Sequence, residues 1–254
     1  MGFQTVFKRY ELKYMLTPEQ KERVLGAIAP YMALDHYGRT TIRNIYFDTE
    51  SYRLIRRSIE KPIYKEKLRV RSYATATHGS TVFVELKKKY KKVVYKRRLP
   101  LTEGEAMTWL LGRAPCPVDT QISREIDYFR EFYGDLRPAV FLSYEREAYY
   151  ERGGGDFRLT FDDRILCRRE EIDLTVPPGG EALLADGQVL MELKCSGGLP
   201  LWMVEILSRE GIYKTSFSKY GTAYQRLILP ARFPSNHTES KEKWINGSHL
   251  SRNF

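Results

Sequence analysis

Six segments of this chain have the composition of β-strands and place charged or polar side chains two positions apart. Side chains at positions i and i+2 of a strand point to the same face of a sheet. A face that is mostly cationic cannot pack as an ordinary core, because burying an unpaired charge is very costly. This face is therefore hydrated or holds a ligand of opposite charge, and the simplest such ligand is a polyanion. The six pairs are Glu11 and Lys13, Arg69 and Arg71, Glu85 and Lys87, Lys96 and Arg98, Tyr144 and Arg146, and Glu192 and Lys194.

The overall charge of the chain agrees with an anionic ligand but does not identify it. The 254 residues carry a formal net charge of +10, which attracts phosphates, nucleic acids and anionic membranes alike. Three cysteines without metal-like spacing indicate reduced thiols in a cytosolic protein. We find no secretory signal and no apolar run near the ~18–20 residues that cross a bilayer. The sequence therefore predicts a cytoplasmic protein without a transmembrane segment.

The order of strand and helix patterns predicts the fold class. Thr17 and Pro18 begin a helix with a capping box, and Pro115 and Pro117 break another. Helices interrupt the strands without alternating with them one for one, which favours an α+β fold with an antiparallel sheet or barrel. About eight strands with charged inward side chains indicate a barrel wide enough to hold a ligand. The predicted strands are 3–15, 40–47, 65–73, 81–88, 93–99, 139–150, 157–167 and 189–194, and the predicted helices are 17–31, 50–59, 103–111, 121–133, 201–211 and 219–227.

One domain is expected over residues 1–230, followed by a polar and flexible tail over residues 231–254. Gly153, Gly154 and Gly155 lie between two predicted strands. They lack the Lys-Ser/Thr ending of a phosphate loop, so hairpin turn chemistry explains them better.

Arginine and lysine pairs make up most of the charged face. The guanidiniums of Arg69 and Arg71 would lie side by side, and guanidiniums bind phosphate oxygens bidentately. Each pair taken alone fits a hydrated sheet face with cross-strand ion pairs, but its repetition on six strands favours a binding surface. Lys87, Lys96 and Arg98 extend this surface, and Arg146 and Arg158 add to it from the far side of the barrel.

Three glutamates share this face with the cations. Glu11, Glu85 and Glu192 balance positive charge or hold a divalent metal, since Mg²⁺ and Mn²⁺ are commonly bound by one or two carboxylates together with substrate phosphates. The four histidines fall in predicted loops or in the tail. A zinc site and a Ser-His-Asp or Cys-His hydrolase are therefore disfavoured.

The order and spacing of these motifs resemble a VTC domain, the polyphosphate polymerase module of the triphosphate tunnel metalloenzyme (CYTH-like) superfamily. The resemblance spans about residues 7–228. Its carriers are FKRYELKY (7–14), IYFD (45–48), LRVR (68–71), VELK (84–87), KRRL (96–99), YER (144–146), FRLTFD (157–162), MELK (191–194) and SFSKY (216–220).

The resemblance implies an eight-stranded antiparallel β-barrel that forms a triphosphate tunnel, with helices packed outside. It implies that basic side chains grip phosphates, that Glu192 holds Mn²⁺ or Mg²⁺, and that Glu11 and Glu85 are further metal candidates. The implied catalytic residues are Arg69, Arg71, Lys87, Arg146 and Arg158, and the implied phosphate-binding residues are Lys13, Lys96, Arg98, Tyr144, Lys194, Ser218 and Lys219.

The VTC resemblance predicts a metal-dependent transfer of the ATP γ-phosphate to a growing polyphosphate chain. Many hydrolases and cyclases of the superfamily open with Glu-x-Glu-x-Lys, whereas this chain has Arg9 in place of the first glutamate, which favours the polymerase branch. Two alternatives stay open: a tripolyphosphatase or nucleoside triphosphatase, and a non-catalytic module that binds polyphosphate or inositol phosphates. Sequence-specific nucleic acid binding is ranked low, because most tyrosines lie at strand positions that also suit a core.

Overall fold

A single antiparallel sheet forms the centre of the computed structural model, which describes residues 10–91 and 93–232. Its strands follow one another in the order β1-β9-β7-β6-β2-β3-β4-β5, and the short β8 pairs with β7. All the strand pairs are antiparallel. The strands are β1 (Tyr10–Leu16), β2 (Met32–Thr49), β3 (Tyr64–Ser72), β4 (Thr81–Tyr90), β5 (Val93–Thr102), β6 (Leu136–Glu151), β7 (Arg158–Arg168), β8 (Glu181–Ala182) and β9 (Val189–Cys195).

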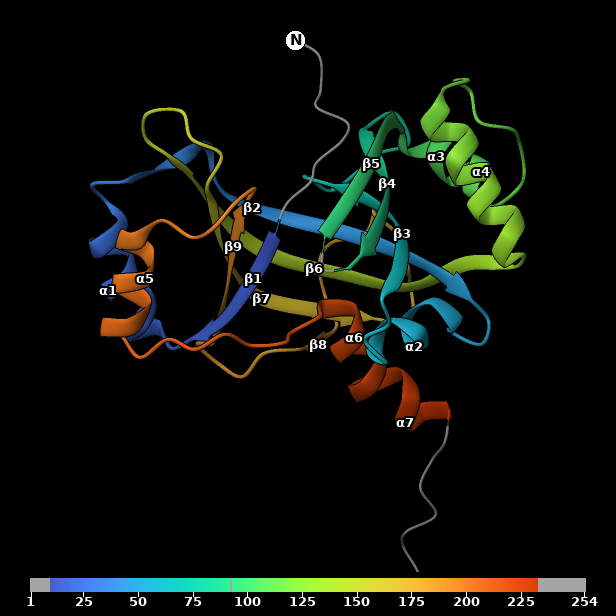
Figure 1. The fold of residues 1–254 in the computed structure, drawn as a ribbon. Coiled ribbons are helices and arrows are strands. Elements are labelled where there is room, and N and C mark those ends of the chain that lie inside the picture. Colours follow the sequence, from blue (N-terminus) through green and yellow to red (C-terminus); the bar gives the residue numbers. More distant parts are fainter. Residues whose placement is uncertain (1–9, 92, 233–254) are drawn as a thin grey trace, which may run out of the picture.

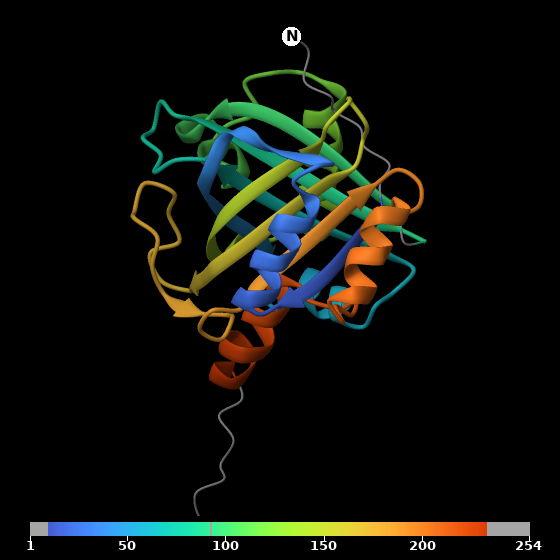
Figure 2. The same ribbon diagram turned by 90° about the vertical axis from the view of Figure 1, so that its left-hand side faces the viewer.

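The sheet curls until its two edge strands, β1 and β5, approach each other (Figures 1 and 2). No backbone ladder joins these two edges within residues 10–91 and 93–232, so a seam runs along the barrel. The expected α+β fold, an antiparallel barrel with helices outside, is confirmed. Its closure comes from curvature and side chains instead of a complete ring of backbone hydrogen bonds.

Helices cover the barrel on two sides because each strand has an apolar outer face. On β3, Leu68 and Val70 alternate with the arginines and pack under α3 (Glu103–Leu110) and α4 (Gln121–Tyr133), around the buried Trp109. On the other side, Leu159 and Leu193 pack with α1 (Pro18–Ile28) and α5 (Leu201–Arg209) (Figure 2). The charged side chains that alternate with these apolar residues thereby point to the inner face.

A C-terminal helical segment packs against the inner apolar residues near one end of the barrel. It comprises α6 (Lys219–Ala223), a π-helical turn (Tyr224–Ile228) and α7 (Leu229–Arg232), and it lies beside α2 (Arg53–Ile59) (Figure 1). Residues Tyr220, Tyr224 and Ile228 join a buried cluster that takes its strand residues from β2, β6, β7 and β9. None of the clustered residues comes from β3 or β4.

Asp48 fixes this segment to the end of β2. Its buried carboxylate accepts hydrogen bonds from the backbone N–H groups of Leu54 and Ile55, at 2.9 and 3.0 Å, and so caps α2. The hydroxyl of Tyr220 donates to the same carboxylate at 2.9 Å. Because Tyr220 lies in the first turn of α6, this hydrogen bond fixes the position of that turn relative to β2. Ser218 and Lys219, at the start of α6, are positioned with it.

Most predicted elements occur where the sequence placed them. The capping box at Thr17 is present, and the helix over residues 121–133 has the predicted bounds. Strand β2 is longer than the predicted 40–47, and β8 was not predicted.

Arg9 and most of the predicted tail, residues 233–254, lie outside the described residues, so the single domain over 1–230 stays a prediction. Across the described ranges, no helix combines the length and apolarity needed to span a membrane.

Candidate functional site

The residues that the sequence singled out meet on the inner face of the barrel. They come from strands that are far apart in the chain, and the curl of the sheet brings them together. They lie on β1 (Glu11, Lys13), β3 (Arg69, Arg71), β4 (Glu85, Lys87), β5 (Lys96, Arg98), β6 (Tyr144, Arg146), β7 (Arg158) and β9 (Glu192, Lys194), with Ser218 as the N-cap of α6 and Lys219 as its first residue.

Glu85 is the centre of one group of cations. The sheet register places it opposite Arg69 on β3 and opposite Arg98 on β5. Its Oε2 lies 2.8 Å from Nε of Arg69 and 3.8 Å from Nε of Arg71. Its Oε1 lies 2.8 Å from Nε of Arg98 and 2.7 Å from Nζ of Lys96. We call these five residues the arginine cluster.

The arginine cluster keeps its carboxylate ionised. Burial alone would raise the pKa of Glu85, but the four surrounding cations outweigh it and hold the pKa well below its usual value. Burial also lowers the pKa of Lys96 to about 7, even though Glu85 favours the charged lysine. The cluster thus has three permanent guanidinium charges and one amine that titrates near neutral pH.

Neutral oxygens orient two of the arginines. Nη1 of Arg69 donates to the hydroxyl of Tyr46 at 2.9 Å. Arg71 donates through Nε to Oδ1 of Asn44 at 3.0 Å and through Nη2 to the hydroxyl of Tyr144 at 3.2 Å. The sequence predicts Tyr144 as a phosphate-binding residue, and it does not predict Tyr46 or Asn44 as site residues. Asn44 and Tyr46 lie two residues apart on β2, as the charged pairs do on the other strands. This i, i+2 spacing of polar side chains could have identified both as site residues.

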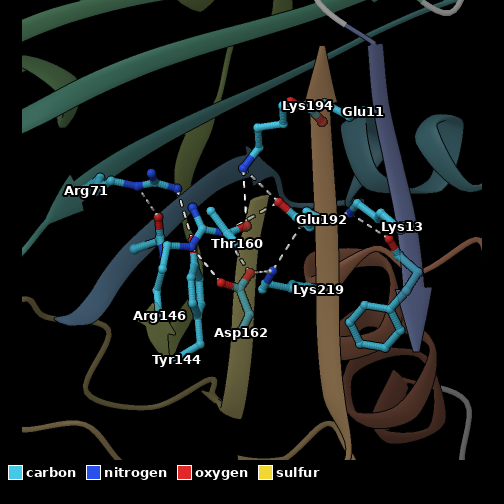
Figure 3. Close-up of polar contacts among 12 residues, drawn as sticks. Glu11, Lys13, Arg71, Tyr144, Arg146, Thr160, Asp162, Glu192, Lys194 and Lys219 are labelled. Carbon is cyan, nitrogen blue, oxygen red and sulfur yellow. Dashed lines mark hydrogen bonds and ion pairs between the residues drawn. The ribbon is translucent and has the colours of Figure 1, made fainter. Parts of the chain in front are cut away.

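A second group of charges surrounds two carboxylates (Figure 3). Asp162 is fully buried, and its oxygens lie 2.6 Å from Nε and Nη2 of Arg146. Lys219 donates to Asp162 at 2.5 Å and lies 3.4 Å from Glu192. The other contacts of Glu192 are equally long, at 3.3 to 3.5 Å. We call Asp162, Glu192, Lys13, Arg146, Lys194 and Lys219 the carboxylate cluster.

Both carboxylates of this cluster are ionised for the same reason as Glu85. Burial would raise their pKa values, but Arg146 and Lys219 hold the pKa of Asp162 below its usual value. Lys219, followed by Lys13, holds the pKa of Glu192 well below its usual value. Burial lowers the pKa of Lys194 to about 8.

Asp162 was missed as a site residue by the sequence reasoning. It lies two residues after Thr160 and four after Arg158, on the same face of β7 as both. It also lies directly opposite Arg146 on β6. The i, i+2 spacing identifies charged pairs within one strand, whereas Asp162 has its charged partner on the neighbouring strand.

Arg158 and Ser218 occupy the edge of the site. Arg158 lies opposite Lys194, but its guanidinium donates to the backbone oxygens of Gly155 and Phe157, at 3.4 Å each. The hydroxyl of Ser218 accepts from Nζ of Lys67 at 3.1 Å. The structure therefore brings the other expected residues into contact networks. The hydrogen bonds of Arg158 go to its own loop, and its guanidinium lies 5.9 Å from the ring centre of Tyr150 on β6.

Residues 8–228 match the family model described as the VTC domain. The chain belongs to the VTC domain family. No curated protein sequence matches it. Among solved structures, the VTC domain is similar to a Bacillus halodurans protein described as a "putative adenylate cyclase", with 16% identity and a TM-score of 0.55, covering 89% of this chain and 100% of that one.

A second similar structure is a Hippeastrum "putative adenylyl cyclase", whose description reports a dominant triphosphatase activity. Its identity is 13% and its TM-score 0.51, and the match covers 87% of this chain and 95% of that one. At such identities the similarity concerns the fold, which is the curled antiparallel barrel of this VTC domain.

The carboxylates of the VTC domain differ in how firmly cations hold them. Glu85 lies among four cations, and Lys87 contacts Glu11 through both carboxylate oxygens, at 2.9 and 2.7 Å. Glu192 has only long contacts with cations, whereas both oxygens of Asp162 lie 2.6 Å from Arg146, so Glu192 is the carboxylate of this cluster that could hold a metal ion. No group of three or more His, Cys, Asp or Glu side chains gathers within the described ranges. This donor set fits an ion bound by one or two carboxylates together with substrate phosphates.

Proposed function

We propose that this VTC domain is a phosphotransferase that moves the γ-phosphate of ATP to the end of a growing polyphosphate chain. The observation that carries the proposal is the pairing of two buried clusters on one inner face. Four cations surround one carboxylate in the arginine cluster, and four surround two in the carboxylate cluster. Each cluster retains excess positive charge, which suits a linear anion lying between them.

The chemistry of phosphoryl transfer asks mainly for positioning and for neutralisation of charge. In the proposed reaction the bond between the γ-phosphorus and the bridging oxygen breaks, and ADP leaves. A terminal oxygen of the polyphosphate chain forms the new bond to phosphorus. That oxygen is already ionised, so the reaction needs no general base.

Separate residues take separate roles in this proposal. Arg69, Arg71 and Arg146 hold β- and γ-phosphate oxygens in bidentate contacts. Lys219, at the start of α6, neutralises charge on the transferred group. Phosphate-binding roles follow for Lys13, Lys96, Arg98, Tyr144 and Lys194.

Glu192 would hold Mn²⁺ or Mg²⁺ together with substrate phosphates. When bound, such an ion supplies additional neutralisation of the phosphate oxygens.

A metal-dependent triphosphatase is the second candidate. The same clusters would hold the triphosphate, and water would accept the γ-phosphate. The fold similarity to the Hippeastrum protein with triphosphatase activity favours this candidate. A module that binds polyphosphate without turnover is the third.

Product analysis separates the three candidates. The protein is incubated with ATP, Mn²⁺ and a short polyphosphate primer, and the products are resolved by size. Chains longer than the primer support the polymerase, whereas orthophosphate as the sole product supports the triphosphatase. Binding of tripolyphosphate without any product supports the module.

Two variants test the residue assignments. Arg69→Ala with Arg71→Ala removes two charge-assisted contacts of ~1.5–3 kcal/mol each, so tripolyphosphate affinity should fall at least a hundredfold. The matched control is Arg97→Ala, because Arg97 lies between Lys96 and Arg98 on β5 but contacts Glu125 of α4 on the outer face. Glu192→Ala should weaken Mn²⁺ dependence, and undiminished metal-dependent turnover would contradict its role.

A further inference from the structure

Four lysines form a row on the inner face beside the arginine cluster. Lys67 lies directly opposite Lys87, and Lys65 lies directly opposite Lys89, on strands β3 and β4. We call these four residues the lysine row. Like charges placed directly opposite each other in an antiparallel pair are destabilising. The fold therefore carries two repulsive pairs in succession, in the same register that places Arg69 opposite Glu85.

The lysine row has little negative charge around it. In the part of the chain that the structure describes, the sole carboxylate within ion-pair distance of the row is Glu11, which Lys87 contacts. The amine of Lys65 donates to the backbone oxygen of Ser58 at 3.0 Å, and that of Lys67 donates to the hydroxyl of Ser218. Neutral oxygens orient these two amines without neutralising them.

Burial and neighbouring lysines disfavour the charged form of two amines in the row. Burial, and after it the charges of Lys13, Lys87 and Lys65, lowers the pKa of Lys67 well below its usual value. Burial and nearby cations likewise lower the pKa of Lys65. The lowered pKa values agree with the geometry, because the four amines lie close together and a bound anion would relieve their repulsion.

The position of the row relates it to the proposed reaction. Lys67 precedes Arg69 by two residues and Lys87 follows Glu85 by two, so the row continues the wall of the arginine cluster. At ~3.3 Å per strand residue, the row extends this wall by roughly 13 Å from Arg69 to Lys65. The apolar cluster of the C-terminal segment uses β2, β6, β7 and β9, and leaves the β3–β4 wall to the lysines.

We propose that the lysine row is a second phosphate-binding stretch, which holds the part of a polyphosphate chain beyond the phosphates gripped by the two clusters. This inference rests on the proposed function, because it assumes that the clusters bind a linear phosphate chain. The row gives the domain a preference for long chains over tripolyphosphate. Its lysines act as point charges along the chain and do not distinguish one phosphate from the next.

The test compares two ligands and two double variants. Binding of tripolyphosphate and of a size-fractionated long-chain polyphosphate is measured by calorimetry at fixed ionic strength. The row variant is Lys65→Gln with Lys89→Gln. The matched control is Lys88→Gln with Lys91→Gln, which removes the same charge from the same hairpin. Lys88 faces Glu125 on the outer surface, and Lys91 is exposed in the turn.

We expect the wild type to bind the long chain more tightly than tripolyphosphate. The row variant should lower this ratio of affinities by about tenfold, since two partly exposed charge contacts are lost. The salt dependence of long-chain binding should become shallower by about 1.4 in the slope of log K against log salt. The control variant should keep both the ratio and the slope.

The possible failures are distinguishable. A wild type that binds neither ligand overturns the proposed function itself. Equal ratios in the row variant and the wild type overturn the lysine row while leaving the clusters in place. A variant with Lys65→Arg and Lys89→Arg keeps the charge and should retain the ratio, so loss of the ratio in that variant also counts against the row. A poly-uridine RNA that depends on the row as strongly as polyphosphate does would overturn its proposed ligand.

Discussion

Lys87 on β4 and Glu11 on β1 form an ion pair across the seam where the barrel lacks backbone hydrogen bonds, with Nζ 2.7 Å from Oε2. Burial would raise the pKa of Glu11, but the charge and hydrogen bond of Lys87, together with the charge of Lys194, lower the pKa to about 2. The seam is therefore bridged by side chains at the level of the charged interior. Glu11 and Lys87, which lie on strands far apart in the sequence, thus help to close the barrel.

We expect the seam pair to contribute about 1 kcal/mol of coupling energy to folding. The measurement is a double-mutant cycle of Glu11→Gln and Lys87→Gln, followed by urea unfolding. The control cycle uses Asp119→Asn and Arg124→Gln, an ion pair in which both side chains are largely exposed. Its coupling should be near zero, and equal values for the two cycles would contradict a special role of the seam pair.

Glu85→Gln should destabilise the protein by about 3–5 kcal/mol, because four cations would lose their buried counter-charge. Thermal unfolding with and without tripolyphosphate measures the effect, and the ligand should raise the Tm of this variant more than that of the wild type. Glu125→Gln on the outer surface is the control, with an expected change within about 0.5 kcal/mol. Similar losses in both variants would argue against the arginine cluster as a charge-balanced unit.

Lys96 should make anion binding depend on pH. Its pKa of about 7 in the folded protein rises when a phosphate binds beside it, so binding takes up a proton. Tripolyphosphate affinity should therefore fall as the pH rises above about 7. Calorimetry over a pH series measures this, and Lys96→Arg should flatten the profile because guanidinium stays charged. Parallel profiles for the two proteins would contradict the assignment.

The same residue affects stability with the opposite sign. In the unfolded chain Lys96 has the ordinary lysine pKa of 10.5. Between about pH 7 and that value the unfolded chain binds more protons at this residue, so its contribution to the stability of the ligand-free fold rises with pH. Urea unfolding of the wild type and Lys96→Arg across this range checks the sign.

Asp48→Asn should destabilise the protein by about 2–3 kcal/mol, because an amide nitrogen would face buried N–H donors. It should also reduce tripolyphosphate affinity, since Asp48 anchors Tyr220 next to Lys219. Tyr220→Phe, which deletes a single hydrogen bond, should cost about 1 kcal/mol. Urea unfolding and calorimetry report the two effects separately, and an Asp48→Asn variant with native stability would contradict the anchoring role.

Local signals predicted most of the fold. The capping box at Thr17 fixes the start of a helix through contacts within four residues, so the sequence displays it directly. The first part of β2 was missed because Leu34 and Tyr37 are exposed and follow no apolar alternation. The π-helical turn over 224–228 places Tyr224 and Ile228 in a buried cluster with distant strands, and no local pattern reports these contacts.

The candidate site was predictable only in part, because some of its contacts depend on which strands are neighbours in the sheet. Charged pairs within one strand revealed the inner face on six strands. Asp162 and the lysine row depend on which strand lies next to which, and this register is a long-range property. The seam contact between Glu11 and Lys87 likewise needs the curl of the whole sheet.

The pairing of β1 with β9 has a consequence for how the protein is made. Tyr10 lies opposite Cys195, and within the described strands β1 has a ladder only with β9. During synthesis β1 emerges before the other described strands, yet its partner β9 emerges after all of them, and Lys219 emerges later still. The nascent chain must therefore keep β1 unpaired for most of synthesis, a situation that favours slow folding and transient exposure of a strand edge. Anion binding through Lys219 becomes possible only when translation of the domain is almost complete.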